Sequence, residues 1–148
     1  MSGVALDWTL AGEREAVAAL GVLYTASRHQ RPAMDEIGRM LVDHTRLRFE
    51  RGKAPDGAEW IPSLRALREG GKTLIDSRQL DQSLTHNAAD DHVEVGSAKV
   101  YAAIHQLGGD AGRGHKVHLP ARPYLGIDGD DADDIREIAV RHLARGLP

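Results

Sequence analysis

The 148-residue sequence contains no cysteine. Disulfide bonds, thiolate nucleophiles and cysteine-ligated zinc or iron–sulfur centres are therefore excluded. The chain also lacks any run of about 18 apolar residues, and its first residues lack the basic segment of a signal peptide. We therefore expect neither a transmembrane helix nor secretion through a standard signal.

Aromatic residues make up only 4% of the chain, and the formal net charge is -3. A nucleic-acid-binding protein usually has a broad basic surface or a platform of aromatic rings, and this composition predicts neither. The 41% apolar and 28% charged content is instead typical of a globular domain. We predict a single domain over residues 1–148.

Helical periodicity near both ends, with strand-like segments between, predicts an α+β fold. Apolar residues recur at helical spacing over residues 10–27 and again from Pro32 to about Arg51. A C-terminal helix is expected over residues 131–144. We predict two N-terminal helices, a small and mostly antiparallel sheet, and this last helix. The inward stripe of the second helix is expected at Ile37, Met40, Leu41, His44 and Leu47.

The middle of the chain contains short strand-like runs separated by turn formers. Strands are expected at residues 83–87, 93–95 and 117–119, residues 122–127 allow one more, and short helical segments are expected at 76–80 and 97–107. Two segments rich in glycine and proline, 52–73 and 108–116, are expected to be flexible loops.

Three groups of residues have the composition of a chemical site, and each departs from the motif it suggests. Residues 70–73 end like a phosphate-binding loop but lack its first glycine. The aspartates of 128–134 break the calcium-loop pattern and suit a helix N-terminus. His115 and His118 would lie on opposite faces of a strand, with His105 upstream. We predict no catalytic site, metal or cofactor, and a protein that is not an enzyme.

Basic residues concentrate at the end of the second helix and in the loop after it. They are Arg46, Arg48, Arg51, Lys53, Arg65, Arg68 and Lys72. Such a group can contact DNA phosphates or an acidic partner. It can also be a solvated helix end, where cations complement the helix dipole. Both interpretations stay open.

Several segments together carry a family pattern. They are Arg48-Phe49-Glu50, PDGAEWIP at 55–62, LIDSRQL with SL at 74–84, VEVGS at 93–97, YAAIHQLGG at 101–109 and PARPYLG at 120–126. In this order they resemble the phage virion morphogenesis family, which includes Mu-like G proteins and tail completion proteins. Gln79 stands where the family usually has a glycine.

The resemblance implies a structural protein that completes the phage tail or neck and permits head–tail joining. It implies self-assembly into a homo-oligomeric ring, a hexamer by family expectation, in the host cytoplasm and then in the virion tail or neck. The implied partners are further copies, the tail tube and the neck or connector proteins, without a membrane. A connector component that contacts DNA in the lumen is the alternative.

Residue type further suggests which side chains meet a partner. Aromatic rings and arginine carry interface energy well, because they combine area with directed donors. We therefore predict an interface at Trp60, Tyr101, His105, Arg122 and Tyr124. Tyrosines are also common in protein cores, so Tyr101 and Tyr124 could belong there instead.

Overall fold

The computed structural model describes residues 14, 17–18, 20–21 and 30–145, so most of the helix expected over 10–27 lies outside the described residues. No helix within those ranges is both long and apolar enough to cross a membrane. The described chain packs as two compact units. Unit 1 contains residues 45–84 and 96–126, and unit 2 contains the described residues up to 44, 85–95 and 127–145.

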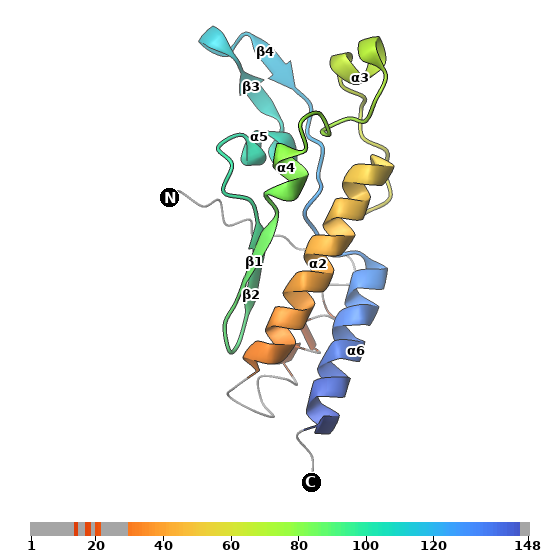
Figure 1. Ribbon diagram of the computed structural model, residues 1–148, viewed down its shortest axis with the longest axis vertical. Helices are drawn as coiled ribbons and strands as arrows, with labels where there is room; N and C mark the ends of the chain where they lie inside the picture. The colour runs from red at the N-terminus through yellow and green to blue at the C-terminus, as the bar shows by residue number, and fades with distance from the viewer. Residues whose placement is uncertain (1–13, 15–16, 19, 22–29, 146–148) are drawn as a thin grey trace. The chain divides into compact units, whose positions relative to one another are not determined.

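Unit 2 is built on two helices. Helix α2, Arg31–Arg51, contributes its first part, and helix α6, Gly129–Arg145, packs against it (Figure 1). Their facing sides hold the apolar core of this unit, which consists of Ala33, Met34, Ile37, Ala132, Ile135, Ile138 and Ala139. The predicted second and last helices are therefore confirmed, each with bounds within about two residues.

A hairpin of strands β1, Thr85–Ala88, and β2, Val93–Gly96, completes unit 2. Its four-residue connection is too short for a parallel crossover, so the pair is antiparallel as predicted. Gly38 of α2 explains the close approach of this hairpin, since a Cβ there would lie 2.5 Å from His86 and 2.8 Å from Val93. A larger residue would push the hairpin away from the helix.

Helix α6 begins with a reciprocal cap. The Asp128 carboxylate accepts from the Asp131 amide at 2.8 Å, and the Asp131 carboxylate accepts from the Asp128 amide at 3.0 Å. Asp131 is fully buried and also contacts His44 at 2.6 Å. These bonds satisfy amides that a helix start leaves without partners. They support the helix-cap interpretation of the 128–134 aspartates.

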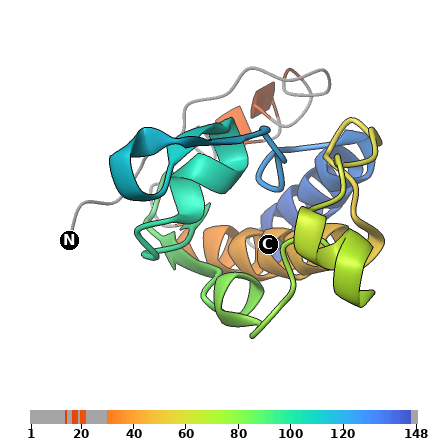
Figure 2. The same cartoon turned by 90° about the horizontal axis from the view of Figure 1, so that it is seen from above.

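Unit 1 combines the end of α2 with short elements. These are α3, Leu64–Glu69; α4, Gln79–Gln82; α5, Ala102–Leu107; β3, Gly109–Ala111; the 3-10 turn η1, Arg113–His115; and β4, Val117–Leu119. Strands β3 and β4 pair antiparallel with Asp110 opposite His118, and α5 lies beside them (Figure 2).

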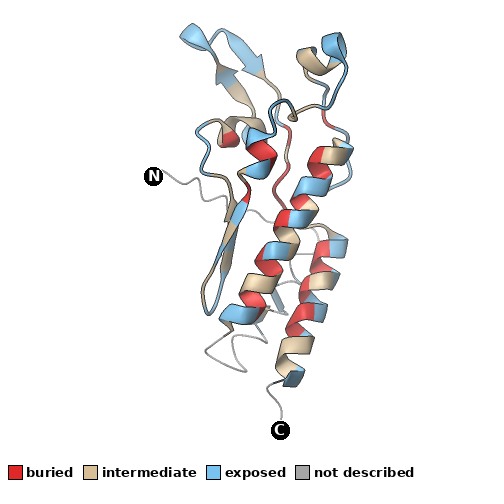
Figure 3. Cartoon of the chain, viewed as in Figure 1, coloured by how far each residue is buried: buried red, intermediate tan, exposed pale blue. Residues whose placement is uncertain are grey.

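The structure confirms an α+β fold and corrects several details. Strands within the described residues form two separate two-stranded sheets rather than one. Residues 108–116 include β3 and η1, and residues 52–73 include α3, while the flexibility of both segments stays a prediction. The single domain also stays a prediction. Leu47 is 47% exposed, because the buried stripe of α2 runs through Thr45 and Arg48 instead (Figure 3).

Candidate functional site

The PARPYLG residues, hereafter the 120–126 segment, cross unit 1 without regular secondary structure. The fourth predicted strand, at 122–127, is therefore wrong. Yet Arg122, Tyr124, Leu125 and Gly126 are all buried. A buried backbone must find hydrogen-bond partners, and without a strand ladder they must come from side chains. The residues that supply them define the candidate site.

Gln106 of α5 supplies three of these bonds. Its Oε1 accepts from the amides of Tyr124 and Leu125, each at 2.9 Å, and its Nε2 donates to the Leu125 carbonyl at 3.1 Å. The side chain thereby acts as a strand neighbour would, with both donors and acceptors matched. Because Gln106 is only 9% exposed, little water can replace it.

Arg48, near the end of α2, approaches the same segment. Its Nη1 donates to the carbonyls of Tyr124 at 3.2 Å and Gly126 at 2.9 Å. A buried guanidinium is costly unless its donors are used, and carbonyl oxygens are suitable acceptors. Arg48 is thus a buried cross-link between α2 and the 120–126 segment, and not a solvated cation.

Two bonds in opposite directions join the PDGAEWIP loop to the 120–126 segment. The Trp60 Nε1 donates to the Pro123 carbonyl at 2.8 Å, and the Arg122 Nε donates to the Ile61 carbonyl at 2.7 Å. Burial lowers the pKa of Arg122. These contacts bring together residues about 60 positions apart in sequence.

Aromatic contacts fill the space beneath these bonds. The Phe49 ring meets Trp60 edge-on with centroids 5.6 Å apart, and meets Tyr124 at 5.1 Å. The Tyr124 hydroxyl donates to the Ala102 carbonyl at 2.8 Å. Burial raises the pKa of Tyr124 to about 12, so its hydroxyl keeps the proton that it donates. The site is therefore a packed aromatic centre surrounded by directed hydrogen bonds.

The structure brings the five predicted interface residues into this one region of unit 1. Trp60, Arg122 and Tyr124 are at most 6% exposed and find their polar partners within the unit. Tyr101 and His105 are half-buried, with their rings edge to face at 6.0 Å. Of the two tyrosines that could belong to an interface or to the core, Tyr124 lies in the core. A partner contact through Tyr101 stays a prediction.

His105 contacts both the half-buried Tyr101 ring and the buried Arg122. Its carbonyl accepts from the Arg122 amide at 2.8 Å, and its buried Nδ1 has no partner within the described residues. Burial first, and then the charge of Arg122, lower the pKa of the imidazole. The ring is therefore favoured in its neutral form.

Sequence reasoning did not single out Arg48 and Gln106 as site residues. Both lie inside segments that carry the family pattern. Gln106 is a polar position in a largely apolar helix, which is a signal because a buried polar residue needs partners, whereas Arg48 stands among charged neighbours that hide it. The targets of both side chains, however, are backbone groups that no side-chain motif identifies.

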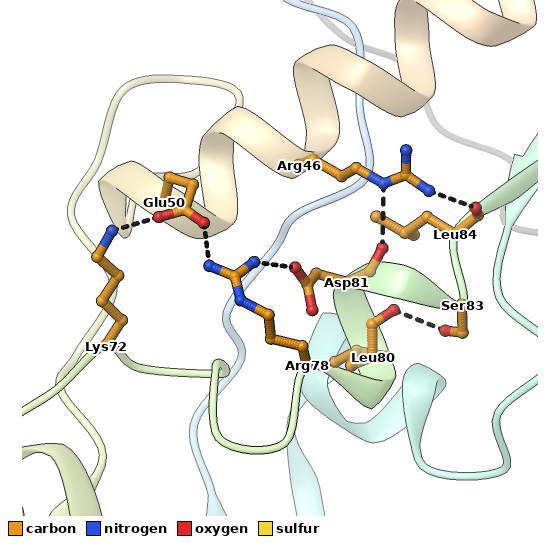
Figure 4. Close-up of polar contacts among 8 residues, drawn as sticks. All are labelled: Arg46, Glu50, Lys72, Arg78, Leu80, Asp81, Ser83 and Leu84. Atoms are coloured by element: carbon orange, nitrogen blue, oxygen red, sulfur yellow. Dashed lines mark hydrogen bonds and ion pairs between the residues drawn. The ribbon is translucent and has the colours of Figure 1, made fainter.

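A second polar cluster of unit 1 surrounds Glu50 (Figure 4). Lys72 and Arg78 both bond its carboxylate, Arg78 at 2.6 Å, and Arg78 also reaches the Asp81 carboxylate at 2.8 Å. The hydrogen bonds from Lys72 and then Arg78 lower the pKa of Glu50 to about 2. The cluster therefore ties the end of α2 to the residues before α4.

Arg78, directly before Gln79, has a left-handed backbone with φ of +60°. A side chain in this conformation costs about 1 kcal/mol relative to glycine. Its bonds to Glu50 and Asp81 offset that cost.

Several of the basic residues are held by internal partners. Arg46 bonds the Asp81 and Leu84 carbonyls, Arg65 bonds the Lys72 and Ile75 carbonyls, and Arg48 is buried as described. This favours a structural use of the group over a continuous surface for DNA. Among the described residues, no group of three or more histidines and carboxylates is arranged to hold a metal, and His118 pairs with Asp110.

Comparisons with known proteins find similarity over most of the chain, including the segments that build this site. A family model described as the phage virion morphogenesis family matches residues 13–144. The chain is 37% identical to the Mu-like prophage FluMu G protein 2 of Haemophilus influenzae, covering 84% of this chain and 86% of that protein.

Two phage proteins are also similar. The putative capsid assembly protein G of Escherichia phage Mu is 32% identical, over 72% of this chain and 75% of the relative. The tail completion protein S of Escherichia phage P2 is 32% identical, over 74% of this chain and 81% of the relative. No solved structure matches the chain.

Proposed function

Because the chain belongs to the phage virion morphogenesis family, we propose that it completes the phage tail or neck and so permits heads and tails to join. The observation that carries this proposal is the family match over residues 13–144, together with a relative named tail completion protein S. The protein would act in the host cytoplasm during assembly and at the virion tail or neck, with tail tube and neck or connector proteins as partners.

The chemistry of the site supports an architectural role. Arg48, Gln106 and Arg122 have side chains that enzymes commonly use on substrates, yet here each bonds backbone groups of its own unit. These bonds connect α2, α5 and the PDGAEWIP loop to the 120–126 segment. Segments of the family pattern thus bond to one another, and a defined surface built in this way is what an assembly protein presents to its partners.

A ring of identical subunits is the assembly we propose. Each subunit of a ring must present one face to a neighbour and a different face to the next. Large apolar side chains exposed in unit 1 include Val100 at 97% and Leu64 at 68%, which suits a surface that other chains cover. The energy of such a contact comes from burying these side chains.

Native mass spectrometry over a range of concentrations tests the ring. We expect one discrete closed oligomer, a hexamer by family expectation. A monomer at every concentration would contradict a preformed ring. Strong, salt-dependent binding of duplex DNA by the same sample would favour the connector alternative instead.

Electron microscopy of phage lysates tests the role in assembly. A phage that lacks this chain should accumulate filled heads and unjoined tails, and the chain supplied in trans should restore joined particles. Normal numbers of infectious virions without the chain would refute the proposed role. A Gln82→Met variant, altered at an exposed position of α4, should restore assembly as well as the unaltered chain.

A further inference from the structure

Helix α3 exposes apolar side chains instead of burying them. None of its residues is buried, Leu64 and Leu67 are each 68% exposed, and Ile61 just before the helix is 61% exposed (Figure 3). Leu64 and Leu67 lie three positions apart on the helix and therefore share one side of it, and Ile61 lies in the chain just before them. We call Ile61, Leu64 and Leu67 the α3 face. An exposed apolar cluster of this kind suits a contact with another protein.

The α3 face is held in place before any partner arrives. The Ser63 hydroxyl caps the helix by accepting from the Ala66 amide at 3.1 Å, and the Thr73 hydroxyl accepts from the Ser63 amide at 3.1 Å. Arg65 then donates to the Lys72 and Ile75 carbonyls at 2.9 and 2.8 Å. A six-residue helix that buries nothing is thus fixed by polar bonds, which lowers the ordering cost of binding.

The charge around this face indicates an acidic partner. Arg65 and Lys72 are used within the unit, Arg65 by backbone carbonyls and Lys72 by Glu50, so Arg68 is the cation that this helix presents outward. Arg68 is exposed and lies one turn beyond Leu64. A matching surface would combine an apolar side chain with exposed carboxylates.

Helix α6 of the same chain has that combination. On α6, Asp133, Glu137 and Val140 are spaced four and then three positions apart, so they lie on one side of the helix. All three are exposed, Val140 at 58%. We call these three residues the α6 face. Arg136 pairs with Asp133 at 3.1 Å, which makes Glu137 the principal carboxylate available to a cation. The α3 and α6 faces therefore match in both apolarity and charge.

We propose that the α3 face of one copy binds the α6 face of a second copy of this chain. The contact uses two different faces, as a ring requires, and so rests on the proposed ring. Three side chains are fewer than a stable interface of about 800 Å² per partner contains. Two copies alone should therefore associate weakly, and closure of the ring should stabilise the contact.

Disulfide cross-linking tests the contact directly, because the chain has no cysteine of its own. Leu67→Cys and Val140→Cys variants are made separately, mixed and oxidised, so any mixed disulfide joins two chains. We expect a linked dimer in the mixture and much less with either variant alone. Leu107→Cys, at a position 61% exposed, is the matched control when mixed with Val140→Cys.

Charge reversal gives a second, reversible readout. Arg68→Glu and Glu137→Arg should each raise the concentration for half-assembly about tenfold, because each places like charges at the contact. The double variant should recover most of the loss. Arg113→Glu, an exposed change in η1, should leave assembly unchanged. Circular dichroism verifies that every variant folds.

The outcomes separate this inference from the ring itself. If native mass spectrometry finds a closed oligomer but Leu67→Cys links no better than Leu107→Cys, the α3–α6 contact is refuted and the ring stands. The same holds if the double charge reversal fails to recover assembly. If the chain stays monomeric and forms no mixed disulfide, both proposals are overturned.

Discussion

Replacing Gln106 by methionine tests whether side-chain bonds to the 120–126 segment stabilise unit 1. Methionine has a similar length, so the change removes the hydrogen bonds with little cavity. Two amides and one carbonyl, of Tyr124 and Leu125, would lose their partner in a buried place. Each unsatisfied group costs about 1–3 kcal/mol, so the three together should cost about 3–9 kcal/mol of unfolding free energy.

Urea denaturation followed by circular dichroism and by tryptophan fluorescence measures this loss. A typical domain has about 5–15 kcal/mol of stability in total, so the midpoint should fall by a large fraction. Gln82→Met makes the same chemical change at an exposed position and should alter stability by less than about 0.5 kcal/mol. If Gln106→Met costs no more than Gln82→Met, the bonds do not stabilise the fold and the reasoning fails.

Gln106→Glu adds a pH signature to the same test. The carboxylate keeps the two accepted bonds but places a second oxygen where Nε2 now lies 3.1 Å from the Leu125 carbonyl. Burial and this repulsion raise the pKa of the introduced acid in the folded state. A raised folded pKa means that the variant gains stability as pH falls and loses it as pH rises. A pH-independent difference from the unaltered protein between pH 5 and 8 would refute this account.

Three further changes test other local structures. Gly108→Ala should lower the free energy of unfolding by about 2–4 kcal/mol, because its φ is +73° and a Cβ would lie 2.7 Å from a backbone nitrogen. Gly57→Ala is the control: its φ is +85° but it faces open space, so it should cost only about 1 kcal/mol in the same thermal denaturation. Gly38→Ala should destabilise unit 2 by about 1–3 kcal/mol although alanine favours helix, because its Cβ would lie 2.5 Å from an imidazole carbon of His86. An unchanged melting temperature would contradict this packing. Glu50→Gln should remove part of the loss of stability in acid. The low pKa of Glu50 in the folded state gives stability that is present above the unfolded pKa and is lost as pH falls towards about 2. The unaltered protein should therefore lose more stability than the variant between pH 4.5 and 2.

The helices and the family were predictable from the sequence because their signals are local. Helix α2 and helix α6 follow from apolar spacing, and Pro32 and Gly52 mark the two ends of α2, so neither helix needs knowledge of distant residues. The family pattern is a linear order of short segments, so it too is read directly along the chain. The comparisons confirmed it over residues 13–144.

The candidate site was predictable only in part. Residue type singles out Trp60, Arg122 and Tyr124, but it does not separate an interface from a core, because such residues suit both equally well. For Arg48, basic neighbours at the helix end suggest either a surface for a partner or a solvated helix end, and neither predicts its burial. Whether each is buried depends on segments far along the chain.

The sequence by itself determined the α+β class, the main helices and the family of this protein. Only the tertiary structure decided that Arg48 and Gln106 turn inward and satisfy the backbone of the 120–126 segment. It also decided that Leu64 and Leu67 stay outside, on a helix fixed by polar bonds. The physical reason is that periodicity and capping act within a few residues, whereas burial is set by which distant segments pack together.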